Sequence, residues 1–99
     1  MKSILLLCAS GITSSLLTEK LNDLFKDNLN GYCLIPCPVC DVAKYADASS
    51  MILLTPQVRF NYEKIQQMYP NKYVLVIDNN DYQQLNIHHI FKMIKAKLK

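Results

Sequence analysis

The sequence predicts an α/β fold, namely a four-stranded parallel sheet in the order 2-1-3-4 with helices on both faces, giving three α/β/α layers. Fully apolar runs at residues 4–7 and 51–54 indicate strands that are buried on both faces. Each run is followed by a segment whose apolar residues lie three and four positions apart, which is typical of a helix packed on a sheet. Right-handed crossovers between four parallel strands then favour the order 2-1-3-4.

Length and composition limit the function classes. The 99 residues suffice for one core, so residues 1–99 are expected to form a single domain. A net charge of +3, with no interleaving of aromatic and basic residues, gives no indication of a nucleic-acid partner. The apolar run at residues 4–9 is too short for a signal peptide or a membrane span. We therefore expect a cytoplasmic protein whose four cysteines are reduced.

The first half of the chain predicts two strand–helix units. The first strand is expected at residues 2–7 and its helix at residues 14–26, with Thr13 or Ser14 as the N-cap. The second strand is expected at residues 32–35. A short helix beginning at Pro38 and closed by residues 47–50 follows, and its predicted apolar face comprises Val39, Val42, Ala43 and Ala46.

The second half repeats the pattern. The third strand, residues 51–54, precedes a helix capped by Thr55 with Pro56 at its first position. The buried stripe of that helix is predicted to comprise Val58, Tyr62, Ile65 and Tyr69. The fourth strand is expected at residues 73–77, followed by a turn at residues 78–81. The last helix, with Asn86 as cap, is predicted to bury Ile87, Ile90, Phe91, Ile94 and Leu98, and no role is assigned to His88 and His89.

The most informative stretch is the strand-to-helix turn at residues 8–15. It consists almost wholly of small and hydroxyl residues: Cys8, Ala9, Ser10, Gly11, Ile12, Thr13, Ser14 and Ser15. Such a turn directs backbone N–H groups and a helix N-terminus at one spot, which suits an anion. A thiol held there has its thiolate form favoured and becomes a nucleophile. A lone cysteine ending an apolar run is more often inert core, but an inert cysteine does not require the polar run that follows it. The pattern predicts that Cys8 attacks phosphate in a cradle formed by residues 9–15.

Topology adds two residues to this site. In the order 2-1-3-4 the switch point lies between strands 1 and 3, and ligands bind at the carboxyl ends of the strands there. The loop after strand 3 starts at Thr55, so Gln57 or Arg59 is expected near Cys8, at the rim of the phosphate site.

Cys37 and Cys40 form a competing motif. A C-x-x-C pair after a strand and at a helix start is the redox arrangement of thioredoxin-like proteins. The layout opposes that interpretation, because Pro56 begins a helix whereas the thioredoxin proline precedes an antiparallel hairpin. One such pair, with His88 and His89 far along the chain, is a weak zinc signal, so no metal or cofactor is expected. Small buried thiols are the simpler interpretation, and a regulatory Cys37–Cys40 disulfide stays open.

The chain resembles the lactose/cellobiose-type IIB components of the bacterial phosphoenolpyruvate-dependent sugar phosphotransferase system. The resemblance covers essentially the whole chain and is most specific at residues 8–17, 54–59 and 76–78. It implies a phosphotransferase in which Cys8 becomes phosphocysteine by accepting the phosphoryl group of a phosphohistidine on the IIA component. It further implies transfer to a sugar, a β-glucoside or disaccharide such as cellobiose, chitobiose or lactose, bound by the membrane IIC permease. The protein would then lie at the inner face of the membrane. Family members typically have a polar, cysteine-free segment in place of residues 37–40.

The same turn also resembles the low-molecular-weight tyrosine phosphatases, which place a cysteine, five residues and an arginine around phosphate. The arginine position is Ser14 in this chain. An arginine stabilises the charge that develops during hydrolysis, whereas N–H and hydroxyl donors hold a phosphocysteine while doing less to hydrolyse it. The alternatives to a carrier are a phosphatase or arsenate reductase with Asp78 or Asp81 as general acid, and a thioredoxin-like module on Cys37 and Cys40.

Overall fold

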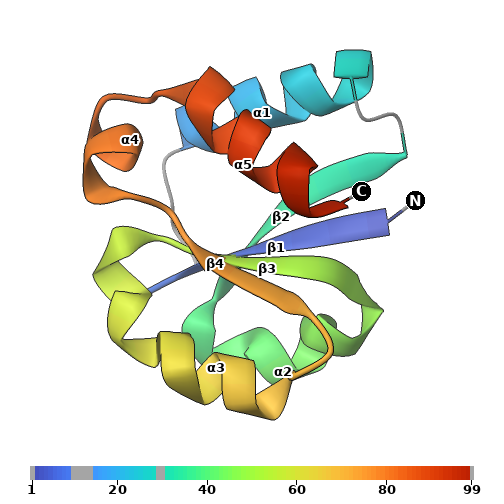
Figure 1. Ribbon diagram of the computed structural model, residues 1–99, viewed down its shortest axis with the longest axis vertical. Helices are drawn as coiled ribbons and strands as arrows, with labels where there is room; N and C mark the ends of the chain where they lie inside the picture. Colours follow the sequence, from blue (N-terminus) through green and yellow to red (C-terminus); the bar gives the residue numbers. More distant parts are fainter. Residues whose placement is uncertain (1, 10–14, 29–30, 99) are drawn as a thin grey trace.

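The computed structural model describes residues 2–9, 15–28 and 31–98 (Figure 1). Its strands are β1 (Lys2–Cys8), β2 (Tyr32–Pro38), β3 (Ser49–Leu54) and β4 (Tyr73–Val76). Its α-helices are α1 (Ser15–Asn28), α2 (Val42–Tyr45), α3 (Tyr62–Met68), α4 (Asn79–Gln83) and α5 (Ile87–Leu98). Three short 3₁₀ helices, η1 (Val39–Asp41), η2 (Ala46–Ala48) and η3 (Pro56–Asn61), complete the described elements.

The four strands form one parallel sheet in the order β2-β1-β3-β4, which confirms the predicted topology. β1 lies inside the sheet, where Ile4 pairs with Leu34 of β2 and with Met51 of β3. Helices α1 and α5 cover one face and α2 and α3 cover the other, as Figure 1 shows. The predicted three-layer arrangement is therefore present.

Alternation along β1 divides the core into two parts. Ile4 and Leu6 pack in the cluster under α1 and α5, whereas Leu5 and Leu7 pack in the cluster under α2 and α3. All four side chains are completely buried. A strand covered on both faces needs an apolar residue at every position, which explains the continuous run in the sequence.

The second strand–helix unit differs from its prediction at both ends. β2 continues to Pro38, because Leu7 and Cys8 of β1 pair with Cys37 and Pro38. The prolines are tolerated because β2 is an edge strand, where a missing N–H costs little. The helical segment accordingly begins at Val39 as η1 rather than at Pro38.

The end of that unit also differs. Ala43, expected on the apolar face, is exposed. β3 begins at Ser49, inside the predicted closing turn, because Ser49 pairs with Ser3 of β1. The buried Ser49 hydroxyl donates a hydrogen bond to the Ala46 carbonyl (2.7 Å).

The segments after β3 and β4 have a different secondary structure from the one predicted. Residues 56–61 form η3, with a non-helical Val58 (φ −112°, ψ 20°), before α3 begins. Tyr62, expected in the buried stripe, is exposed. β4 ends at Val76, and the predicted turn at residues 78–81 is the start of α4. The Asp78 carboxylate accepts hydrogen bonds from the Asn80 and Asp81 N–H groups, since a residue that favours turns also favours the N-cap.

The packing of α1 against α5 gives a stability prediction. Phe25 is completely buried, and its ring centroid lies 5.7 Å from that of Phe91. Phe25→Ala should lower the free energy of unfolding by about 3–5 kcal/mol, because it removes apolar contacts and leaves a cavity. Leu16→Ala, on the same helix but 46% exposed, is the matched control and should cost no more than about 0.5 kcal/mol. Urea unfolding measures both, and equal losses would contradict this packing.

Candidate functional site

Cys8 is the last residue of β1, at the carboxyl end of an interior strand. Its side chain is buried (1% exposed), and its thiol donates to the Cys37 carbonyl across the β1–β2 pair at 3.6 Å. Ala9, which follows, is exposed. The predicted nucleophile thus lies at the expected edge of the sheet, with its thiol packed against the neighbouring strand.

Most of the predicted phosphate cradle falls outside the described residues. This applies to Ser10, Gly11, Ile12, Thr13 and Ser14, and also to the predicted N-cap. Ser15 is the first residue of α1, a helix of 14 residues with no acidic side chain in its first turn. No carboxylate in the first turn of α1 therefore competes with an external anion for the positive end of this helix.

Thr55 connects β3 to β1, the strand that ends at Cys8. Its N–H and its hydroxyl both donate to the Leu7 carbonyl, at 3.0 Å and 3.1 Å. That carbonyl belongs to the peptide that joins Leu7 to Cys8, so the two bonds fix the backbone at Cys8. The side chain predicted to cap the next helix is instead turned toward β1, and no side-chain capping bond forms. The sequence feature that indicates this contact is a hydroxyl residue, Thr55, placed directly after the buried strand that neighbours β1.

Gln57 and Arg59 are both exposed on η3, which starts beside this contact. The Arg59 guanidinium donates to the Pro56 carbonyl (2.9 Å) and lies over the Phe60 ring, 4.4 Å from its centroid. Within residues 2–9, 15–28 and 31–98, neither Gln57 nor Arg59 forms a hydrogen bond or ion pair with Cys8. Their predicted role at the rim stays a prediction.

The remaining cysteines are free thiols, like Cys8. Cys37 is buried and its thiol donates to the Pro38 carbonyl (3.3 Å). Burial, and then the nearby Asp41 carboxylate, raise the pKa of Cys37, so it stays protonated near neutral pH. The interpretation as small buried thiols is wrong for Cys40, which is exposed, with its sulfur 4.0 Å from the Asp41 carboxylate. Over the described part of the chain, no group of three or more Cys, His, Asp or Glu residues is placed to hold a metal ion.

Asp78 and Asp81, the general-acid candidates of the phosphatase alternative, are both engaged elsewhere. Asp78 caps α4. Asp81 accepts hydrogen bonds from the Asn86 amide (3.0 Å) and from the His89 ring (2.6 Å). The bond from Asn86, and then that from His89, lower the pKa of Asp81 below its usual range. A carboxyl group that is ionised near neutral pH is poorly suited to donate a proton, which disfavours Asp81 as a general acid.

No helix within the described ranges combines the length and the hydropathy needed to cross a membrane.

Comparison with known proteins identifies the family of this chain and a solved structure of similar fold. Residues 3–93 match the family model described as the PTS system, lactose/cellobiose specific IIB subunit. The fold is similar to the solution structure of a cellobiose-specific phosphotransferase IIB component protein from Borrelia burgdorferi, with a TM-score of 0.74 and 22% sequence identity. That alignment covers 92% of this chain and 85% of the other. The family match includes Cys8 and the whole of the β3–η3 segment.

Proposed function

Since this chain belongs to the lactose/cellobiose-specific IIB family of the phosphotransferase system, and so takes part in sugar phosphotransfer, we propose that the thiol of Cys8 carries the phosphoryl group. The observation that supports this most strongly is the position of Cys8. A cysteine ends an interior strand of a parallel sheet, next to the switch point between β1 and β3, where such sheets bind ligands. Residues 9–15 are the proposed cradle, with Gln57 and Arg59 at its rim.

The proposed chemistry consists of two displacements at phosphorus. In the first, the Cys8 thiolate attacks the phosphoryl group of a phosphohistidine on IIA. The S–P bond forms and the P–N bond breaks, and the histidine, which carries a proton on its other ring nitrogen, leaves as neutral imidazole. In the second, a sugar hydroxyl attacks, the S–P bond breaks, and the hydroxyl proton passes to a base at the acceptor site. The thiolate is thereby regenerated.

The described surroundings favour a carrier over a hydrolase. A phosphatase needs a cation to stabilise the charge that develops on the transferring phosphoryl group and an acid to protonate the leaving group. Two candidate groups among the described residues serve other contacts: Arg59 is bonded to Pro56 and stacked on Phe60, and Asp81 is ionised between Asn86 and His89. A phosphocysteine that is hydrolysed slowly survives until the sugar accepts its phosphoryl group.

The remaining assignments belong to the same proposal. The donor is the IIA component, and the acceptor is a β-glucoside or disaccharide of the cellobiose, chitobiose or lactose type bound by IIC. Residues 1–99 act as one phosphocarrier domain in the cytoplasm, held at the inner face of the membrane through IIC. Phe60, 81% exposed beside Arg59, gives this edge of the sheet an apolar contact point for such partners.

The first functional prediction compares the cysteines. With a phosphorylated IIA preparation as donor, Cys8→Ser should lose phosphoryl acceptance by several orders of magnitude, because serine is not activated as a nucleophile there. The double variant Cys37→Ser, Cys40→Ser should keep acceptance, since Ser at position 37 can still donate to the Pro38 carbonyl. Mass mapping of the intact adduct measures both, with circular dichroism as a check of folding. If the double variant folds but cannot be phosphorylated, the assignment of phosphoryl acceptance to Cys8 alone is wrong.

The second functional prediction concerns hydrolysis. Because Ser14 stands where a phosphatase has arginine, turnover of p-nitrophenyl phosphate by the wild-type protein should not exceed that of Cys8→Ser. Release of p-nitrophenolate, followed by absorbance, measures this. Sustained release that depends on Cys8 would favour the phosphatase alternative.

A further inference from the structure

His89 and Asp81 form an imidazole–carboxylate pair to which the proposed carrier chemistry gives no role. Asp81 lies on α4, is 9% exposed, and accepts a hydrogen bond from Nδ1 of His89 at 2.6 Å. The side chain of His89, in the first turn of α5, is 71% exposed. One side of the ring is therefore held by the protein while the rest faces solvent.

The hydrogen-bond pattern determines which ring nitrogen is nucleophilic. The hydrogen bond from Asn86 to the other carboxylate oxygen (3.0 Å) helps keep Asp81 ionised, so Asp81 only accepts. The proton between the two groups must then belong to Nδ1. In the neutral ring this leaves a lone pair on Nε2, the nitrogen that is not bonded to Asp81.

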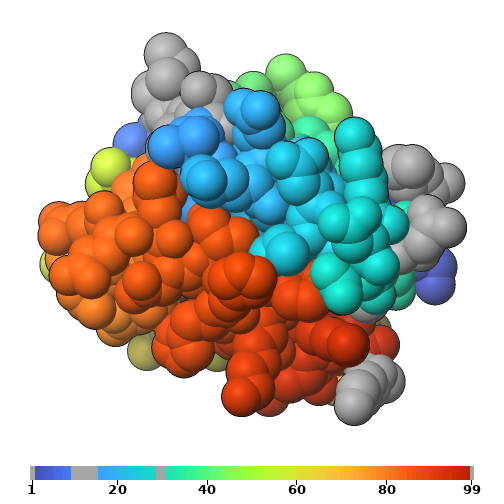
Figure 2. Space-filling view, turned by 90° about the horizontal axis from the view of Figure 1, so that it is seen from above, coloured from blue at the N-terminus to red at the C-terminus, as the bar shows by residue number. Residues whose placement is uncertain are grey.

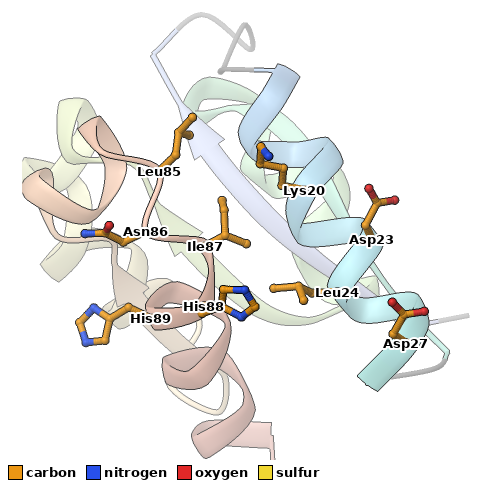
Figure 3. A pocket seen from close by; sticks show the side chains of 9 residues that line it. All are labelled: Lys20, Asp23, Leu24, Asp27, Leu85, Asn86, Ile87, His88 and His89. Atoms are coloured by element: carbon orange, nitrogen blue, oxygen red, sulfur yellow. The ribbon is translucent and has the colours of Figure 1, made fainter.

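The neighbourhood differs between the two adjacent histidines. A hollow of about 790 Å³ separates α1 from the start of α5 on the face of the molecule seen in Figure 2, and its α1 wall carries Asp23 and Asp27. In Figure 3, His88 projects toward that wall, whereas His89 projects from the opposite side of α5. Both histidines line this hollow, whose α1 wall also carries Lys20, and both lie in the first turn of α5, so the positive end of that helix is available to a phosphate at either ring. They differ in what holds the ring: Nδ1 of His89 is bonded to Asp81, whereas among the described residues His88 has no carboxylate bonded to its ring.

We propose that Nε2 of His89 is a second phosphoryl-accepting nucleophile of this protein, with Asp81 as its positioning residue. In the step, the Nε2 lone pair attacks the phosphorus of an N-phosphoryl donor, the new N–P bond forms, and the donor P–N bond breaks. With phosphoramidate as donor, the electron pair of that bond leaves with ammonia. Nδ1 keeps its proton, and the Asp81 carboxylate balances the positive charge that forms on the ring. The step requires neither Cys8 nor the phosphate cradle.

The test uses phosphoramidate on the full chain near neutral pH, with site mapping by mass spectrometry in non-acidic solvent, because phosphohistidine is labile in acid. Cys8→Ser serves as the parent, which removes phosphocysteine from the count. His89 should be labelled on the order of tenfold faster than His88 in the same molecule, the size of effect that a carboxylate behind an imidazole has in metal sites. His89→Gln should lose this label, and the matched control His88→Gln should keep it.

Asp81→Asn tests the positioning role separately. It should reduce labelling of His89 on the order of tenfold while leaving the rate at His88 unchanged, and nitrogen NMR should show His89 changing from one tautomer to a mixture. Equal labelling of the two histidines, absence of histidine labelling, or an Asp81→Asn variant that labels His89 at the parental rate would each overturn the proposal. His89 and His88 are compared within one protein, the Cys8→Ser parent, so this comparison needs no further variant that must fold.

Discussion

The burial of β1 on both faces is the constraint on which the other features of this structure depend. Ile4, Leu5, Leu6 and Leu7 are completely buried, and alternate side chains enter two separate cores. Each fully buried aliphatic side chain contributes roughly 1.5–3 kcal/mol relative to exposure, so covering only one face would forfeit half of this stabilisation. Helices on both faces require crossover connections, which make the sheet parallel and direct every strand's carboxyl end to one edge. Cys8 lies at that edge because it is the residue at which the buried run ends.

Among the described residues, the same edge is held together by hydrogen bonds to backbone carbonyls rather than by ion pairs. The Leu7 carbonyl accepts two hydrogen bonds from Thr55, and the Cys8 thiol donates to the Cys37 carbonyl. The residue before the proposed nucleophile is therefore fixed from β3, and the nucleophile itself contacts β2. A strand end fixed in this way presents the sulfur of Cys8 without rearrangement of the scaffold.

The sheet could be predicted from sequence because its signals are strong and local. Residues 4–7 and 51–54 are continuous apolar runs, and right-handed crossovers leave few orders for four parallel strands. The predicted element boundaries were wrong where a residue type is compatible with two local structures. Pro36 and Pro38 suggested that β2 had ended, yet an edge strand accommodates both. Asp78 suggested a turn, yet it caps α4. The position of Cys8 could be predicted because the apolar run ends there. The Asp81–His89 pair could not, because it depends on how α4 packs against α5, and hydrophobic periodicity gives no information on that packing.

The central claim, that the phosphoryl group resides on the sulfur at the end of β1, is tested most directly by NMR of the isotope-labelled protein before and after phosphorylation by IIA. The account predicts a displaced Cβ resonance of Cys8, with amide shifts concentrated in residues 8–15 and 55–59. The amides of residues 90–98, in the body of α5, should keep their positions. An unchanged Cys8 Cβ resonance in fully phosphorylated protein, with the phosphoryl group located on another side chain, would contradict it.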